Sequence, residues 1–244
     1  MNSKHQCSMD NIKTWESLEQ LFEAMNESLD YLVLRNTEDI TKEFSPAIHG
    51  DIDILVRDLK TAIQLMQAIK YHKEPYRVYY EVKVADGIVP FDIRYVGDNY
   101  YCEKWENDVL NHRVFVENRG MKYYMMSPEQ QYYTLLYHVY LQKKSVSLDY
   151  HDKLTEYAKL ADERYINEVS VVMSQLVKFM NEHQYTYVLP NDLEVCINRS
   201  NMRHLPNYQC IKIEEKLNSS RILFRIKRLS HKIICKIKKI LHIK

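Results

Sequence analysis

The sequence predicts an α+β protein, with a mixed β-sheet and flanking helices, followed by a helical C-terminal domain and a basic amphipathic tail helix. Three observations predict this fold. Short apolar runs alternate with amphipathic segments in the first half of the chain, the pattern becomes helical from Ser127 onward, and residues 221–244 alternate apolar with basic side chains. We therefore expect a first domain over residues 1–122, a helical domain over 123–218 and a tail helix over 219–244.

The first domain begins with a helix and two strands. Residues 14–28 carry apolar side chains every three or four positions, which predicts an amphipathic helix. The apolar, β-prone run over 31–35 predicts a short buried strand. Residues 37–50 have the composition of a loop, residues 51–56 predict the next strand, and the helical spacing over 59–70 predicts a second helix.

An antiparallel hairpin follows in the sequence. Two alternating runs, at about 76–85 and 88–96, flank the dipeptide Asp86-Gly87. Asp-Gly is favoured in tight hairpin turns because glycine accepts a positive φ. One α+β unit is thus expected to fill roughly residues 10–120.

The second half of the chain has a helical pattern. Ser127-Pro128 is typical of a helix start, since proline suits the first helical position. Helices are predicted over 128–143, 149–162, 165–183 and, at the basic end of the chain, 219–242.

Composition excludes some classes of protein. The chain of 244 residues is 45% apolar and 27% charged, which is ordinary for a folded globular protein. It contains only four glycines. Phosphate loops of the Rossmann or Walker type need several glycines close together, and the chain has too few to make such a loop expected. These two modes of nucleotide binding are therefore not expected.

Cysteine usage and hydropathy predict a cytoplasmic location. The five cysteines are odd in number, scattered and without zinc-type spacing, which favours reduced thiols. The N-terminus lacks the apolar stretch of a signal peptide, and no run of about 18 apolar residues occurs. The cysteines are Cys7, Cys102, Cys196, Cys210 and Cys235.

The tail differs in charge from the rest of the chain. Nine of the 34 Lys and Arg lie in residues 221–244, which contain no Asp or Glu, so residues 1–220 have 25 basic and 33 acidic residues, a formal charge of −8. A basic amphipathic helix of this kind suits an anionic membrane surface, and we expect a peripheral position on the inner face of the cell membrane. Docking on the acidic body and pairing with a partner helix remain alternatives.

Two carboxylates begin the strand in the stretch "HGDIDILV". Side chains alternate across a strand, so Asp51 and Asp53 emerge on one face, while Ile52 and Ile54 point to the other. Carboxylates this close raise one another's pKa unless a cation neutralises them. Mg²⁺ binds oxygen ligands, usually one or two carboxylates together with substrate phosphates and waters.

A third carboxylate lies in the later stretch "VPFDIRYV". If the strand that carries Asp92 pairs beside residues 51–56, three carboxylates converge, as a site for two metal ions requires. Arg94 shares the face of Asp92 and is positioned to contact a phosphate or to pair with a carboxylate.

These motifs resemble the DNA polymerase β-type nucleotidyltransferase superfamily. The resemblance rests on Gly50-Asp51-Ile52-Asp53 with its apolar continuation and on Asp92, and it covers about residues 14–96. It implies a mixed sheet, two Mg²⁺ ions (with Mn²⁺ as a substitute) and an NTP whose α-phosphate is attacked by a hydroxyl. It also implies that the first two acids bind both metals and phosphates, while the third holds the catalytic metal.

The chain departs from this family at the phosphate-binding turn. The family carries a Gly-Ser turn after its first strand, whereas this chain has Arg35-Asn36. The pattern is similar to that of a divergent bacterial branch associated with surface polysaccharide, or capsule, synthesis. We expect Arg35, Asn36, Gly50 and Arg94 to bind the nucleotide, and a helical lysine, Lys143, to reach its phosphates.

The sequence therefore predicts a Mg²⁺-dependent transferase that moves a nucleotidyl or phosphate-linked group to a hydroxyl acceptor, such as a glycan or a lipid-linked acceptor. The first alternative is a sugar- or polyol-phosphate transferase with a CDP-type donor. The second is a toxin–antitoxin nucleotidyltransferase that acts on protein or tRNA, and the third is a non-catalytic scaffold. The net acidity of residues 1–220 disfavours a broad nucleic-acid surface, and His138 is interpreted as a structural histidine.

Overall fold

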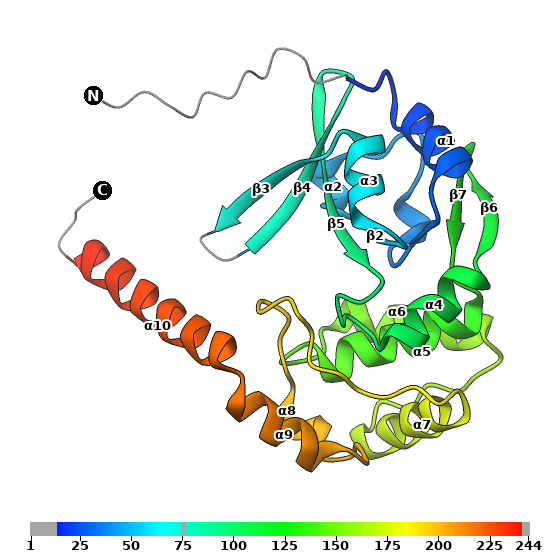
Figure 1. The fold of residues 1–244 in the computed structure, drawn as a ribbon. Helices are drawn as coiled ribbons and strands as arrows, with labels where there is room; N and C mark the ends of the chain where they lie inside the picture. Colours follow the sequence, from blue (N-terminus) through cyan, green and yellow to red (C-terminus); the bar gives the residue numbers. More distant parts are fainter. Residues whose placement is uncertain (1–13, 75–76, 241–244) are drawn as a thin grey trace.

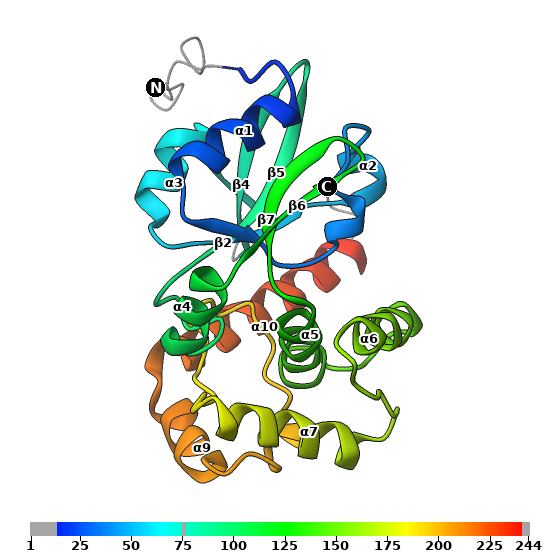
Figure 2. The same cartoon turned by 90° about the vertical axis from the view of Figure 1, so that its right-hand side faces the viewer.

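The computed structural model describes residues 14–74 and 77–240 of the chain. A sheet with α1–α3 forms the upper part of the molecule in Figures 1 and 2, helices α4–α9 form the lower part, and α10 projects from the lower part. The strands are β1 (Tyr31–Val33), β2 (Ile52–Val56), β3 (Ile69–Glu74), β4 (Arg77–Val84), β5 (Gly87–Tyr95), β6 (Val114–Asn118) and β7 (Met121–Met125).

The helices follow the same chain order. The structure has α1 (Leu18–Ser28), the 3₁₀ turn η2 (Thr37–Asp39), α2 (Pro46–His49), α3 (Leu59–Met66), α4 (Glu103–Asn111), α5 (Pro128–Leu141), α6 (Leu148–Leu160), α7 (Val169–Glu182), α8 (Arg199–Met202), α9 (Tyr208–Leu217) and α10 (Ser219–Ile240).

The seven described strands form one mixed sheet in the order β3-β4-β5-β2-β1-β7-β6. β2 runs parallel to β5 and β1 runs parallel to β7, whereas the other neighbours are antiparallel. The predicted α+β fold, with a mixed sheet and flanking helices, is confirmed. The predicted hairpin is β4–β5, although Val84 pairs with Gly87, which leaves Ala85-Asp86 as the turn residues in place of Asp86-Gly87.

The two faces of the sheet bury two different cores. Ile52 and Ile54 of β2 lie on the face that packs against α1 and α3. Leu55 lies on the opposite face, in the core shared with α4 to α7. The predicted alternation along this strand is therefore confirmed, and Asp53 lies on the face that looks toward the helices.

Several predicted boundaries were wrong. The second helix ends at Met66, because Gln67 takes a left-handed conformation, and residues 69–74 form the edge strand β3. The predicted loop over 37–50 contains η2 and α2. These short elements carry weak periodicity, and their conformation depends on contacts outside the segment.

The region between the hairpin and α5 contains three elements that the sequence analysis did not predict, α4, β6 and β7. The last two form a hairpin around Arg119-Gly120, which both have positive φ, as a two-residue hairpin turn requires. β7 lies beside β1 in the sheet, and β6 forms the edge. The predicted domain boundary between residues 122 and 123 consequently falls inside β7.

The helical part is built around α5, whose side chains from Gln131 to Leu141 are all buried. Its tyrosines pack with Trp105 of α4 and with α7 rather than lining an open surface. α5, α6 and α7 match the three predicted helices to within a few residues. The tail helix is present as far as Ile240, while residues 241–244 and 1–13 lie outside the described residues.

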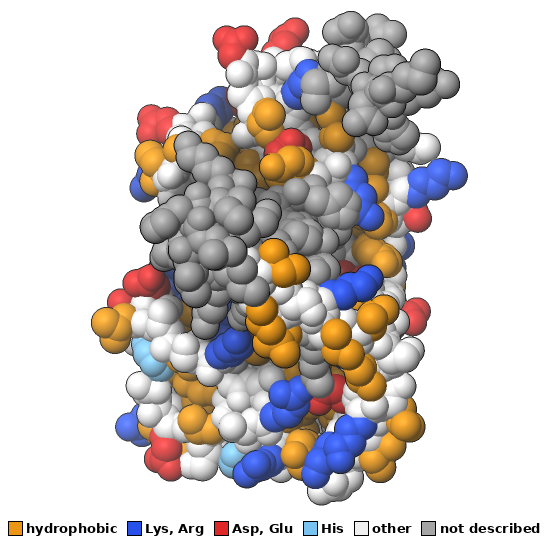
Figure 3. Space-filling view, turned by 90° about the vertical axis from the view of Figure 1, so that its left-hand side faces the viewer, with side chains coloured by type: hydrophobic (Ala, Val, Ile, Leu, Met, Phe, Trp, Pro, Cys, Tyr) orange, Lys and Arg blue, Asp and Glu red, His pale blue; other side chains and the backbone are white. Residues whose placement is uncertain are grey.

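Helix α10 leaves apolar side chains exposed on its described part. Ile226 and Leu229, for example, are 56% and 61% exposed. Figure 3 shows Lys and Arg side chains interspersed with hydrophobic ones on the face from which this helix projects. Among the described residues, no helix combines the length and the apolar character that crossing a membrane requires.

Candidate active site

A cleft of about 360 Å³ lies between the central strands β2 and β5 of the sheet, helices α5 and α6, and the loop that contains Asp192. The predicted site residues that line it are Asp51, Asp53, Asp92, Arg35, Asn36, Arg94 and Lys143. Gly50 does not line the cleft. It follows α2 with φ 80° and ψ −134°, a conformation that L side chains rarely adopt, and so it turns the chain into β2.

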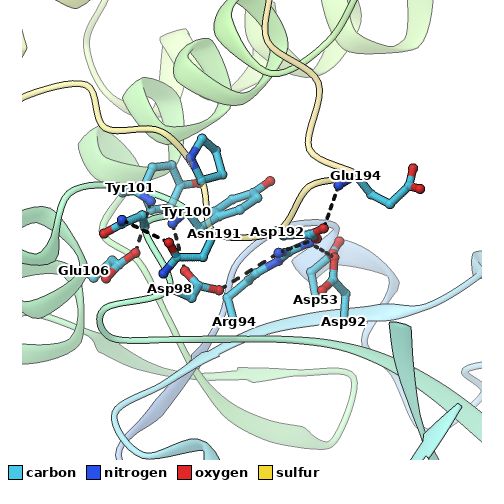
Figure 4. A network of polar contacts seen from close by, with 12 residues as sticks. Asp53, Asp92, Arg94, Asp98, Tyr100, Tyr101, Glu106, Asn191, Asp192 and Glu194 are labelled. Carbon is cyan, nitrogen blue, oxygen red and sulfur yellow. Dashed lines mark hydrogen bonds and ion pairs between the residues drawn. The ribbon is translucent and has the colours of Figure 1, made fainter. Parts of the chain in front are cut away.

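Asp53 and Asp92 lie directly opposite each other on neighbouring parallel strands. β2 and β5 pair in the register that sets Asp53 beside Asp92 and Ile54 beside Ile93. Figure 4 shows the two carboxylates side by side at the sheet. The pairing expected between the two strands is thus confirmed, and the register explains why two acids distant in sequence share one cleft.

Arg35 neutralises Asp53. Its Nη2 donates to Asp53 Oδ1 at 2.7 Å, and its Nε donates to Oδ2 at 3.3 Å. The side chains of this pair are only 12% and 11% exposed. Arg35 follows β1, the antiparallel neighbour of β2, and Asn36 after it has a left-handed φ of 54°.

Arg94 neutralises Asp92 from the same strand. Its Nη2 donates to Asp92 Oδ2 at 2.9 Å, and its Nη1 donates to Asp192 Oδ2 at 2.9 Å (Figure 4). Burial raises the pKa of Asp92, although Arg94 opposes the shift. A carboxylate with a raised pKa accepts a proton more readily, which is useful in a general base.

The donor chemistry of this cleft fits a hard divalent cation, because such ions prefer oxygen ligands and five carboxylates line the cleft, those of Asp51, Asp53, Asp92, Asp192 and Glu194. In this conformation, however, guanidinium groups hold Asp53 and Asp92. Throughout residues 14–74 and 77–240, no three or more His, Cys, Asp or Glu side chains are grouped so as to hold a metal ion. A metal ion here would have to replace Arg35 and Arg94 as the counter-charge.

Tyr100, which was not among the residues predicted for the site, connects the acids to helix α5. Arg35 Nη1 donates to the Tyr100 hydroxyl at 2.6 Å, and this hydroxyl lies 2.6 Å from Nδ1 of His138. Burial, together with the nearby cations of Arg35 and Lys143, lowers the pKa of His138 well below its usual value. His138, interpreted from sequence as structural, is therefore neutral and lines the cleft.

Lys153 of α6 reaches the turn after β1. Its Nζ donates to Asn36 Oδ1 at 2.6 Å and pairs with Glu38 at 2.7 Å. Lys143, the predicted phosphate-binding lysine, also lines the cleft, and its Nζ lies 5.8 Å from the centre of the Tyr150 ring. Nothing in the helical pattern distinguished Lys153 from other surface lysines, because its role depends on where α6 packs.

The loop before α8 closes the cleft on the side away from the sheet. Asp192 accepts from Arg94 and, through Oδ1, from the backbone N–H of Glu194 at 2.8 Å. Figure 4 shows this loop above Asp53 and Asp92. From the sequence, this region was expected only to be irregular, since no regular periodicity marks its residues.

No family model matches the chain, and no curated protein matches it. Among solved structures, the chain is similar to the crystal structure of an antigenic nucleotidyltransferase-like protein from Paracoccidioides brasiliensis. The two chains are 14% identical, the match covers 74% of this chain and 90% of that chain, and the TM-score is 0.37.

Proposed function

We propose that this protein is a nucleotidyltransferase-type enzyme that transfers a nucleotidyl or phosphate-linked group to a hydroxyl acceptor. The observation that carries the proposal is the pairing of Asp53 with Asp92 across parallel strands, at the bottom of a cleft lined by Arg35, Arg94 and Lys143. Carboxylates and cations in one concave site suit phosphoryl chemistry, where positioning and charge stabilisation supply most of the catalysis.

The phosphates of the donor would bind where cations line the cleft. Arg35 and Arg94 each have a guanidinium group that can donate two parallel hydrogen bonds to phosphate oxygens. Lys143 and Lys153 also line the cleft. The cleft volume, about 360 Å³, lies within the range for small-molecule sites. The donor in this proposal is an NTP, with a CDP-linked compound as the alternative.

In the proposed reaction, the hydroxyl oxygen of the acceptor forms a bond to the α-phosphorus of the donor. The bond between that phosphorus and the bridging oxygen breaks, and pyrophosphate leaves with the electron pair. Asp92, which lies beside Asp53 in the cleft, would accept the hydroxyl proton. Mg²⁺ held by Asp51, Asp53 and Asp92 would supply charge neutralisation of the phosphates.

We also propose a biological setting, which the tail and the sequence resemblance support. A basic amphipathic α10 supports a peripheral position on an anionic membrane, which is where lipid-linked glycan acceptors are found. We therefore place the reaction in bacterial surface polysaccharide synthesis.

One observation favours a non-catalytic scaffold as the second candidate. Both Asp53 and Asp92 already have a guanidinium partner, so the acids are neutralised without a metal ion. A scaffold would keep these ion pairs when nucleotide and Mg²⁺ are added. An enzyme of the proposed kind would exchange them.

The distinguishing experiment is a screen of NTPs and CDP-alcohols for Mg²⁺-dependent thermal stabilisation, followed by a transfer assay with the ligand that stabilises. Ligands that bind only the folded state raise the melting temperature by mass action. The Asp53→Asn/Asp92→Asn variant should lose both stabilisation and transfer, whereas Asp86→Asn, in an exposed turn, should keep both. Wild-type transfer in the double variant would exclude the proposed site, and labelling of tRNA or protein would identify the acceptor class of a toxin.

A further inference from the structure

A second groove, of about 690 Å³, continues from the cleft toward the base of α10. The two hollows share one wall, formed by Lys143 and the loop residues Glu194, Val195 and Cys196. The groove is further lined by Lys144, Ser145, Leu193, Ile197, Arg199, Ser200, Arg221, Phe224 and Arg228. A ligand lying in the groove would therefore lie next to the cleft that contains the acids.

The groove is strongly basic. Its lining includes five cations and a single carboxylate, that of Glu194. Residues 1–220 carry a formal charge of −8, so this concentration of positive charge is not a general property of the body. A concave surface of one charge sign raises the local concentration of ligands with the opposite sign. The cations are Lys143, Lys144, Arg199, Arg221 and Arg228.

Two of the cations are held in place by the protein. Arg199 donates to both carboxylate oxygens of Glu215, at 2.6 and 3.1 Å. Arg221 is only 4% exposed and donates to the backbone carbonyl of Pro190. These contacts position positive charge at the wall of the groove before any ligand arrives, which lowers the entropy lost on binding.

Two other cations are accessible. Lys144, in the loop after α5, is exposed, and Arg228 of α10 is 45% exposed. The Arg228 Nη1 lies 3.5 Å from Glu194 Oε2, a distance longer than that of the buried pairs in the cleft. Arg228 is itself exposed and its contact with Glu194 is long, so Arg228 and the exposed Lys144 can both turn toward an anionic ligand at little cost.

We propose that this groove binds a phosphate or diphosphate group of the acceptor substrate. The ligand class follows from the charge and from the size of the groove, which is that of a small-molecule site. Guanidinium and ammonium groups together are the common phosphate partners. The assignment of this anion as the acceptor rests on the proposed function, because the acceptor hydroxyl has to reach the cleft across the shared wall.

Inorganic pyrophosphate, titrated by calorimetry without divalent metal, is the probe of this site. The Lys144→Ala/Arg228→Ala variant should bind it at least tenfold more weakly than the wild type. The control is Lys159→Ala/Lys178→Ala, which removes the same charge from exposed positions on α6 and α7 and should stay within twofold of the wild type. Equal affinities of the two double variants, or no binding to the wild type, would overturn the proposal.

The same titration separates this proposal from the function proposed above. Suppose that the wild type shows no transfer activity, and that Lys144→Ala/Arg228→Ala loses affinity for pyrophosphate while the control double variant does not. The anion site then stands and the enzymatic proposal fails. If transfer is active and both double variants bind pyrophosphate alike, the groove assignment fails by itself.

Vesicles distinguish a lipid-linked phosphate from a soluble one. Phosphatidylcholine vesicles that contain 30% phosphatidylglycerol, on the order of an anionic bacterial leaflet, are sedimented with each double variant. The groove binds a lipid headgroup if Lys144→Ala/Arg228→Ala sediments with the vesicles less than the control does and if pyrophosphate displaces the wild type from the vesicles. Equal sedimentation together with the tenfold difference in pyrophosphate affinity indicates a soluble acceptor, and both results support the phosphate site.

Discussion

Arg35 and Asp53 form a buried ion pair in which Nη2 lies 2.7 Å from Oδ1 and Nε lies 3.3 Å from Oδ2. Arg35 follows β1 and Asp53 lies on β2, so the pair connects two neighbouring strands at the floor of the cleft. Its burial matters because removing one partner of such a pair leaves an uncompensated charge.

The Arg35→Ala variant should unfold with a free energy about 3–5 kcal/mol lower than that of the wild type, since it leaves Asp53 buried and unpaired. Urea denaturation measures the change. In the Arg35→Ala/Asp53→Asn double variant the loss should be smaller than the sum of the two single losses. Additive losses would show that the two side chains are not coupled. Lys178→Ala, which removes one partner of an exposed pair, serves as the control.

Tyr100 should be required for the position of Arg35. Burial raises its pKa to about 12, so the hydroxyl stays protonated at neutral pH and bridges Arg35 and His138. The Tyr100→Phe variant should lose about 1–3 kcal/mol of stability, because a buried donor of Arg35 is left without its acceptor.

The Tyr100→Phe variant should also have a higher KM for the donor nucleotide. Without the Tyr100 hydroxyl, the guanidinium of Arg35 is no longer held in place, so it loses more conformational entropy when it binds phosphate. Steady-state kinetics with the donor found in the stabilisation screen measures it. Tyr71→Phe, at an exposed position on β3, should leave both stability and KM unchanged. An unchanged KM in Tyr100→Phe would contradict the bridging role.

Glu106 should make stability depend on pH. Burial, with a contribution from the neighbouring Asp98, raises the pKa of Glu106 to about 8. Because the unfolded chain has the ordinary pKa of 4.5, the folded state holds a proton that the unfolded state has lost between these two values. The contribution of Glu106 to stability is therefore complete below about pH 4.5 and is lost as the pH rises through about 8.

Melting temperatures of the wild type and of Glu106→Gln, measured from pH 5 to pH 8, test this linkage. The wild type should lose stability relative to the variant as the pH rises, because the amide of the variant does not titrate. His138, whose lowered pKa acts in the opposite direction, is present in both proteins and cancels in the difference. A constant difference across the range would contradict the raised pKa.

The apolar face of α10 should carry membrane binding. Ile226 and Leu229 are 56% and 61% exposed, so aspartate at both positions is tolerated by the fold but opposes insertion into lipid. The Ile226→Asp/Leu229→Asp variant should lose at least tenfold in co-sedimentation with phosphatidylglycerol vesicles. Ser230→Asp adds charge at another exposed position of the helix and should lose much less. Equal losses in the two variants would show that the added negative charge, and not the loss of apolar side chains, weakens binding to the vesicles.

Much of the core of the fold was predictable because it follows from local patterns. The period of two along 51–56 and 88–96 and the period of 3.6 along 128–143 predicted β2, β5 and α5. β3 was missed, since a polar edge strand has weak periodicity. α4 was missed although Trp105, Val109 and Leu110 are buried at helical spacing, which is a local signal. The hairpin of β6 and β7 could have been predicted from Arg119-Gly120, because a glycine at this place suits a tight hairpin turn.

The sequence by itself determined which faces of the strands carry acids and which carry apolar side chains, because alternation is a local property of an extended chain. Only the tertiary structure decided that Asp53 meets Asp92, because the parallel register of β2 and β5 depends on packing between distant segments. It also decided that arginines, rather than a preformed metal cluster, neutralise these acids, and that Tyr100 and Lys153 reach the cleft. Such contacts join separate elements, so no local spacing encodes them.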